Sequence, residues 1–296
     1  MRLHLADTSN DRGQYGALVE EGFRNHLVSF AYKQVALKPF SKVWEDFLDI
    51  HLAAKPSTND GLQAEALVQE SAKNHLLSYA YRQEESAYVP VLTQPDLRCR
   101  VIIDSGAFTA WSTGKVITPK EYAEWALDLE KRWRPKLYSL EFMNLDVIGD
   151  QSATWKNLET LEKLGLQTLP IVTFGVDLKH IDKALALYPY FALGGLVPYS
   201  RQKTKLQSWL DACFTRVMAY RKKTGILRKV HLLGITSDWS LRRYPVFSSD
   251  SSSWVTCLRY GEAPASGLGK IPRYTTSDAA MAATIHALRE IRRAHV

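Results

Sequence analysis

Short apolar runs alternate with amphipathic helical segments along most of the chain. The runs are rich in branched and aromatic residues, and we predict strands at 101–103, 137–142, 168–174, 190–193, 229–235 and 246–249. Thr118 followed by Pro119 signals the start of a helix over 121–132. Thr154 opens another helix, and 206–222 is the longest helical segment. Regular alternation of strand and helix predicts a parallel sheet in an α/β fold.

The N-terminal third of the chain contains a duplication. Residues 17–34 and 66–83 are identical at eleven of eighteen aligned positions, far more than chance gives. The match extends upstream of both segments, so the repeated unit spans 3–34 and again 50–83. Each copy has the pattern of a strand, an amphipathic helix and a second strand, the last predicted by β-rich residues such as 27–32 and their counterpart.

Six strands after the duplication and two from one copy make eight, the number that closes a TIM (β/α)8 barrel of this length. We predict that 50–296 is the TIM-barrel catalytic domain, because the copy at 50–83 directly precedes the strand at 101–103. Residues 1–49 are then an extra copy of the unit, which packs outside the ring or at its edge. A doubly wound open sheet fits the same pattern and is the alternative fold.

Composition narrows the class of protein. Of 296 residues, 46% are hydrophobic and 23% are charged, which is enough for a large globular core. The longest apolar runs are too short to span a membrane, so we expect a soluble, cytoplasmic protein. The cysteines, Cys99, Cys213 and Cys257, lie too far apart to suggest a disulfide framework or a metal knuckle. The net charge of +7 suits a polyanionic partner, although soluble enzymes also reach such values.

Candidate chemistry lies where predicted strands end, because parallel α/β folds place their active sites at the carboxyl ends of strands. Three of these ends carry an aspartate, namely Asp104, Asp146 and Asp250, and another carries Gly194 and Gly195. Aspartates beside serine and glycine also cap helices and turns, which is the alternative interpretation for each of them. Carboxylates that converge without a metal suit retaining displacement at an anomeric carbon, in which one attacks and another moves the proton.

Metal chemistry finds little support in the sequence. The histidines show no ligand spacing, and His231, on an apolar strand, is interpreted as a buried core residue. We therefore predict neither a metal site nor another cofactor.

Four motifs in order give the chain a specific resemblance. Residues 104–108 (DSGAF), 193–196 (LGGL), 231–235 (HLLGI) and 249–254 (SDSSSW) resemble the ordered motifs of the tRNA-guanine transglycosylase superfamily. The resemblance covers about 50–256 and is greatest to the phage and bacterial DNA-guanine transglycosylase branch, the DpdA type. It implies a TIM barrel that exchanges guanine in a polynucleotide for a 7-deazaguanine base.

The resemblance also implies roles for individual residues. Asp250 matches the covalent nucleophile and Asp104 the general acid/base, while Asp146 falls near the carboxylate that reads the guanine edge. A carboxylate can accept from both N1–H and the exocyclic amine of guanine, a pattern that adenine cannot satisfy. The other expected base-pocket residues are Ser105, Gly106 and Phe108 of the first motif and Gly194, Gly195 and Leu196 of the second. Phe108, Tyr199 or Trp254 would supply flat apolar walls, and each would serve equally well in the core.

The polynucleotide is expected to be DNA. The tRNA enzymes carry a zinc subdomain with clustered cysteines, whereas Cys257 is isolated here. Basic residues expected to bind the DNA backbone are Arg201, Lys203, Lys205, Arg242 and Arg243. Two alternatives are a tRNA or free-nucleoside guanine transglycosylase, and a catalytically silent barrel that binds modified nucleic acid. The presence of both Asp104 and Asp250 counts against the silent barrel.

Overall fold

The computed structural model describes residues 49–53, 67, 73–92 and 98–252. In this part of the chain eight parallel strands form one curled sheet in the order β4-β3-β2-β1-β8-β7-β6-β5. The strands are β1 (Asp49–Ala53), β2 (Asn74–Ser78), β3 (Arg100–Asp104), β4 (Ser139–Phe142), β5 (Ile171–Thr173), β6 (Tyr190–Gly194), β7 (Lys229–Leu232) and β8 (Ser248–Ser251). The predicted parallel α/β architecture is confirmed.

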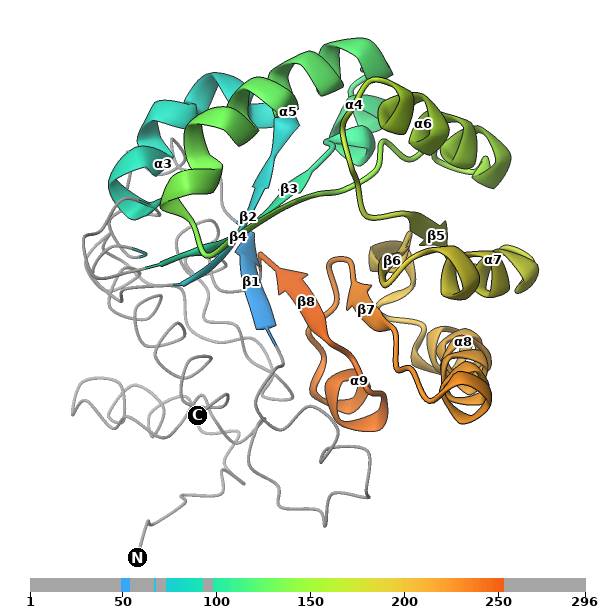
Figure 1. Ribbon diagram of the computed structural model, residues 1–296. Coiled ribbons are helices and arrows are strands. Elements are labelled where there is room, and N and C mark those ends of the chain that lie inside the picture. The colour runs from blue at the N-terminus through green and yellow to red at the C-terminus, as the bar shows by residue number, and fades with distance from the viewer. Residues whose placement is uncertain (1–48, 54–66, 68–72, 93–97, 253–296) are drawn as a thin grey trace, which may run out of the picture.

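Helices cover the convex outer side of this sheet (Figure 1). The α-helices are α3 (Glu85–Leu92), α4 (Ala107–Ser112), α5 (Pro119–Trp133), α6 (Gln151–Lys163), α7 (Lys179–Leu187), α8 (Lys203–Thr224) and α9 (Asp238–Arg243). Short 3-10 segments are η2 (Tyr79–Glu84), η3 (Arg134–Lys136) and η4 (Val197–Tyr199). No helix in the described part of the chain combines the length and apolar character that a bilayer span requires.

The second copy of the duplicated unit supplies β1 and β2, as the sequence predicts. The first copy lies outside the described residues. The sequence predicts a continuous strand over 76–81, but β2 ends at Ser78. The Ser78 hydroxyl accepts a hydrogen bond from the Ala80 amide at 3.3 Å, and the chain turns there into η2. Residues of the predicted domain beyond position 252 also lie outside the described part.

Several predicted element boundaries are corrected. Strand β4 begins two residues later than predicted, β5 covers Ile171–Thr173 rather than 168–174, and β7 ends at Leu232 rather than at 235. The Thr118 hydroxyl and the Glu121 carboxylate form a capping box at the start of α5, as the sequence indicates. By contrast, α6 begins before Thr154, because the Asp150 carboxylate accepts from the Ala153 amide at 2.9 Å and caps the helix there. Strand β8 begins two residues later than predicted and runs on through Asp250.

Strand alternation divides the core into layers. Val101 and Ile103 of β3 belong to the apolar layer beneath the helices, whereas Ile102 between them faces the concave side. The concave side holds its own apolar cluster, contributed by four strands, the residue after β4 and the segment before β5, with members Leu76, Ile102, Met143, Leu169, Ile171 and Ala192. Because Asp104 follows Ile102 by two positions, its side chain lies on the concave side as well.

The two ends of the strand order meet at one point. In the described residues β4 and β5 share no ladder, but Met143 and Leu169 form a parallel bridge. The Asn144 amide donates to the Leu169 carbonyl at 3.0 Å, and the Leu169 amide donates to the Phe142 carbonyl at 2.7 Å. All other pairs of strands that are consecutive along the chain are joined by a parallel ladder, and so are β1 and β8.

Candidate active site

The fold brings the three predicted aspartates to the same end of the sheet. Asp104 is the last residue of β3, Asp250 lies near the end of β8, and Asp146 follows β4 by four residues. They are close enough to act on one another electrostatically. The charge of Asp250 raises the pKa of Asp104, and the charge of Asp104 raises the pKa of Asp146.

Asp104 is held by the neighbouring strand and by the turn that follows it. The Ser78 hydroxyl donates to Asp104 Oδ2 at 2.9 Å, and the Gly106 amide donates to the same oxygen at 3.0 Å. Burial raises the pKa of Asp104 above its ordinary value despite these two hydrogen bonds, which lower it. A carboxyl group with a raised pKa is suited to both giving and taking a proton near neutral pH.

Asp250 is buried and its Oδ1 atom has two partners. The Gly234 amide donates to this oxygen at 2.8 Å, and His231 Nε2 lies 3.1 Å from it. In the described part of the chain Oδ2 has no hydrogen-bond partner. One oxygen of the carboxylate is therefore fixed and the other is unoccupied, which suits a nucleophile.

Asp146 also has a raised pKa. Burial, followed by the charge of Asp104, raises the pKa of Asp146 to about 7. When ionised, this carboxylate accepts hydrogen bonds only, and a partner that offers two N–H groups would favour the ionised form.

Sequence reasoning missed the role of His231. Its side chain is completely buried, as expected of a core residue, but its two nitrogens contact Asp250 and Ser248 rather than apolar groups alone. Strand alternation contains the signal, because Val230 and Leu232 on either side belong to the helix-facing core and leave His231 on the concave face with Asp250.

The first motif has structural and exposed members. Ser105 is fully buried, and its hydroxyl accepts from the Ala107 amide at 3.4 Å. Gly106 has φ +75°, and a Cβ there would lie 2.8 Å from the Ala80 nitrogen, so the position requires glycine. Phe108 is 56% exposed and its ring lies 5.9 Å from that of Trp111, which is 61% exposed. Phe108 is therefore a surface residue of α4 rather than a core residue.

The glycines after β6 are explained by close packing. A Cβ on Gly194 would lie 2.7 Å from Ile171 Cγ2, and one on Gly195 would lie 2.9 Å from Thr173 Cγ2. Leu196 is fully buried in the helix-facing core. The side chains of this turn thus serve packing, and only its backbone is left to meet a ligand.

The predicted basic residues fall into separate groups. Lys205 Nζ lies 4.6 Å from the ring centre of Tyr199, which stacks on Phe174 at 4.1 Å, and Lys203 Nζ lies 5.6 Å from that of Trp239. These two lysines begin α8 and combine positive charge with aromatic surface. Arg243, also predicted to bind DNA, instead pairs within the protein. Its guanidinium donates two hydrogen bonds to the Asp211 carboxylate, at 2.8 and 3.0 Å.

The other residues predicted to bind DNA or the base are Arg201, Arg242 and Trp254. Arg201 is exposed just before α8, and Arg242 is partly buried on α9. Trp254 lies outside the described residues.

Within the described ranges no group of three or more His, Cys, Asp or Glu side chains is arranged to hold a metal ion.

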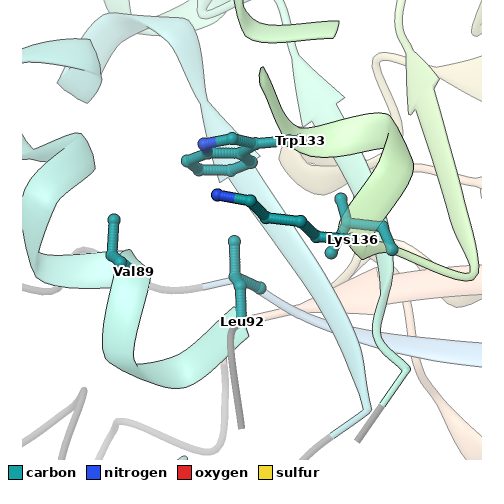
Figure 2. Close-up of a pocket in the computed structure, with 5 residues that line it drawn as sticks. Val89, Leu92, Trp133 and Lys136 are labelled. Carbon is teal, nitrogen blue, oxygen red and sulfur yellow. The ribbon is translucent and has the colours of Figure 1, made fainter. Parts of the chain in front are cut away.

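A small pocket lies elsewhere on the molecule. Figure 2 shows it between α3 and the end of α5, with lining residues Val89, Leu92, Trp133, Lys136 and Leu137. Lys136 and Leu137 precede β4, so the pocket lies toward the amino-terminal end of that strand. The aspartates lie at or just beyond the carboxyl ends of their strands, and the pocket is separate from them.

Comparison with protein-family models and with curated proteins adds no relative. No protein-family model matches the chain, and no curated protein matches it.

Proposed function

We propose that the chain is a guanine transglycosylase that acts on DNA and exchanges guanine for a 7-deazaguanine base through a glycosyl-aspartate intermediate. The observation that carries this proposal is the pairing of two differently held carboxylates at one end of a parallel sheet. Asp250 has one oxygen fixed and one unoccupied, and Asp104 has a raised pKa. A carboxylate with one oxygen free of hydrogen bonds can attack, and a carboxyl group with a raised pKa can donate a proton, so the pair suits a nucleophile and a general acid.

The proposed fold is a closed (β/α)8 barrel. Three observations support closure: β4 and β5, consecutive along the chain, are the two ends of the strand order, Met143 and Leu169 form a bridge between them, and residues of β2, β3, β5 and β6 share a concave apolar cluster with these two residues. In such a barrel the site is at the mouth formed by the strand ends, where the three aspartates lie.

The exchange takes two displacements. In the first, Asp250 Oδ2 attacks C1′ of the target deoxyguanosine, the C1′–N9 bond breaks, and its electron pair goes to N9, which takes a proton from Asp104. In the second, N9 of the incoming 7-deazaguanine attacks C1′ and gives its proton to Asp104. The bond from C1′ to Oδ2 breaks, and the Asp250 carboxylate is restored. Asp104 therefore ends the cycle protonated, as it began.

Base selection is assigned to Asp146 and the turn after β6. The ionised Asp146 carboxylate would accept from N1–H and the exocyclic amine, and backbone amides of 194–196 would donate to O6. Because guanine offers two donors to Asp146, binding guanine lowers the pKa of this group from about 7 and favours the ionised form. A base without those donors leaves a buried charge unpaired, which disfavours its binding.

The polynucleotide is proposed to cross the mouth beside α8. Lys203 and Lys205 would contact phosphates, and the Phe174–Tyr199 pair provides an aromatic surface next to them. The overall charge of +7 supports a polyanionic substrate.

The decisive experiment measures base exchange on defined polynucleotides. The full chain would be incubated separately with duplex DNA, single-stranded DNA and tRNA, each with candidate 7-deazaguanines, and the nucleosides would then be analysed by mass. Asp250→Asn serves as the control for chemistry. We expect a 7-deaza-2′-deoxyguanosine mass in DNA only with the wild-type chain. Incorporation into tRNA alone would replace DNA as the substrate, and binding without exchange on any polynucleotide would refute the transglycosylase.

A further inference from the structure

A chain of hydrogen bonds leads through the concave side of the sheet to Asp250. The Tyr190 hydroxyl lies 2.5 Å from Ser248 Oγ, which lies 2.6 Å from His231 Nδ1. His231 Nε2 lies 3.1 Å from Asp250 Oδ1. Ser248 and His231 are completely buried, so water does not compete for these contacts.

The chemistry of the partners fixes the direction of this chain. An ionised Asp250 can only accept, so His231 Nε2 carries a hydrogen and donates it. Nδ1 of a neutral imidazole is then an acceptor, and the Ser248 hydroxyl must donate to it. The remaining acceptor capacity of Ser248 Oγ takes the Tyr190 hydroxyl. Each group donates toward Asp250, which selects one tautomer of His231.

Ser248, His231 and Asp250 contain the residue types of a serine-hydrolase triad, but their arrangement does not fit one. Ser248 has no exposed surface and its oxygen already contacts Tyr190 and His231. It also begins β8, whereas Asp250 lies nearer the carboxyl end where a substrate would bind. Within this chain of bonds, the group nearest the carboxyl end of its strand is therefore the aspartate and not the serine.

We propose that His231 is a positioning residue for Asp250, with Ser248 and Tyr190 setting its tautomer. Together with the Gly234 amide, His231 fixes Oδ1 and turns Oδ2 toward C1′. When the second displacement breaks the bond between Oδ2 and C1′, both donors stabilise the carboxylate as its charge returns. This inference rests on the proposed transglycosylase function.

The test compares variants along the chain in steady-state exchange. Loss of a donor to a charged group gives an expected fall in kcat of about 10- to 100-fold for His231→Leu, with DNA affinity unchanged. His231→Gln places an amide nitrogen near the position of Nε2 and should recover much of that loss. Ser248→Ala and Tyr190→Phe should have progressively smaller effects, because they act only through the tautomer. His180→Leu removes another hydrogen-bonded histidine, on α7, and should leave kcat unchanged.

A second measurement does not depend on turnover. Nitrogen NMR of the histidine rings should show His231 protonated at Nε2 and unprotonated at Nδ1, with its signal assigned by loss in His231→Gln. Ser248→Ala should shift it toward a mixture of tautomers. If His231→Leu fails to fold, this spectrum and the Ser248→Ala kinetics decide the proposal.

The outcomes separate the two proposals. A wild-type kcat in folded His231→Leu, or an Nδ1–H tautomer in the wild-type chain, would overturn the role of His231 while exchange by the wild type still stands. Absence of exchange by the wild type, or full activity of Asp250→Asn, would overturn the transglycosylase itself.

Discussion

Ser78 and Asp104 are partners in the β2–β3 ladder, and their side chains are joined as well, by a 2.9 Å hydrogen bond from the serine hydroxyl to Oδ2. The last residue of one strand thus holds the last residue of the next. A proposed acid/base group is anchored by the sheet itself rather than by a mobile loop.

This contact has a consequence for pH dependence. Burial raises the pKa of Asp104 and the hydrogen bond from Ser78 lowers it, so Ser78→Ala should raise this pKa further. Formation of the covalent adduct needs protonated Asp104 and is lost as pH rises past that pKa. The alkaline limb of the adduct-formation profile should therefore move to higher pH. Ser112→Ala, an exposed serine of α4, is the control, and an unshifted limb in Ser78→Ala would contradict the assignment.

The two proposed catalytic carboxylates should fail in different ways. Asp250→Asn should abolish both exchange and the denaturation-stable DNA adduct and leave DNA binding nearly intact. Asp104→Asn should stop exchange because the proton cannot be moved. Denaturing gels of guanine-containing DNA with an incoming base measure both effects, with Asp128→Asn on the exposed face of α5 as the control. An adduct that persists in Asp250→Asn and disappears only in Asp104→Asn would reverse the two roles.

Asp146 should make folding stability depend on pH. The pKa of Asp146 is raised to about 7, so the folded protein holds a proton that the unfolded chain releases near pH 4. Its contribution to stability is therefore present below about pH 4 and is lost as pH rises to about 7. Asp146→Asn removes this loss, and its gain in unfolding free energy over wild type should be on the order of 2 kcal/mol larger at pH 8 than at pH 5. Urea unfolding at both pH values measures it, and an equal difference at the two would exclude a raised pKa.

Gly106 and Gly114 form a matched pair for testing the close approach beneath Asp104. Both have positive φ, +75° and +67°, but only Gly106 has a neighbour within 4 Å of its missing Cβ. Gly114→Ala should cost about 1 kcal/mol of unfolding free energy for its backbone conformation alone. Gly106→Ala should cost more, because Ala80 must move, and should also lower activity. Equal costs in urea unfolding would show that the approach of Ala80 is not a constraint.

The start of α8 should contribute to DNA binding without reading sequence. Charge reversal at Lys203 and Lys205 should weaken binding about equally for all sequences and reduce its salt dependence, because phosphate contacts release counterions. Reversal at Lys222 and Lys223, at the other end of the same helix, changes charge equally and is the control. If the two double variants bind DNA alike across salt concentrations, the start of α8 is not part of the interface.

The sequence predicts those elements best whose stability depends on local or apolar signals. Thr118 and Glu121 cap α5 through groups three residues apart, and β3 contains the apolar run 101–103, so both are recognisable in isolation. Strand β8 contains Ser248, Ser249, Asp250 and Ser251, and no apolar residue marks it. It forms because β1 and β7 offer hydrogen-bonding edges on both sides, which is information that lies elsewhere in the chain.

In the candidate site, too, some features can be predicted from local sequence and others depend on residues far apart in the chain. The strand-end rule places the three aspartates together, because it depends only on parallel strands. The rule does not give the reason for Gly194, where the methyl group of Ile171 on the adjacent strand fills the space. Nor does it give the partners of His231, since its contact with Asp250 joins residues nineteen apart in sequence and depends on strand register.

Neighbouring strands of the sheet are joined by ladders, except that a single bridge joins the segments next to β4 and β5. The three aspartates are therefore not held equally firmly relative to one another. Asp250 and Asp104 are connected through the ladders β8–β1, β1–β2 and β2–β3, so these ladders fix the distance between the proposed nucleophile and the proposed acid. Asp146 follows β4, next to the single bridge at Met143 and Leu169. A shift of β4 relative to β5 at this bridge would therefore move Asp146, the residue proposed to bind the base. It would leave the distance between Asp250 and Asp104 unchanged.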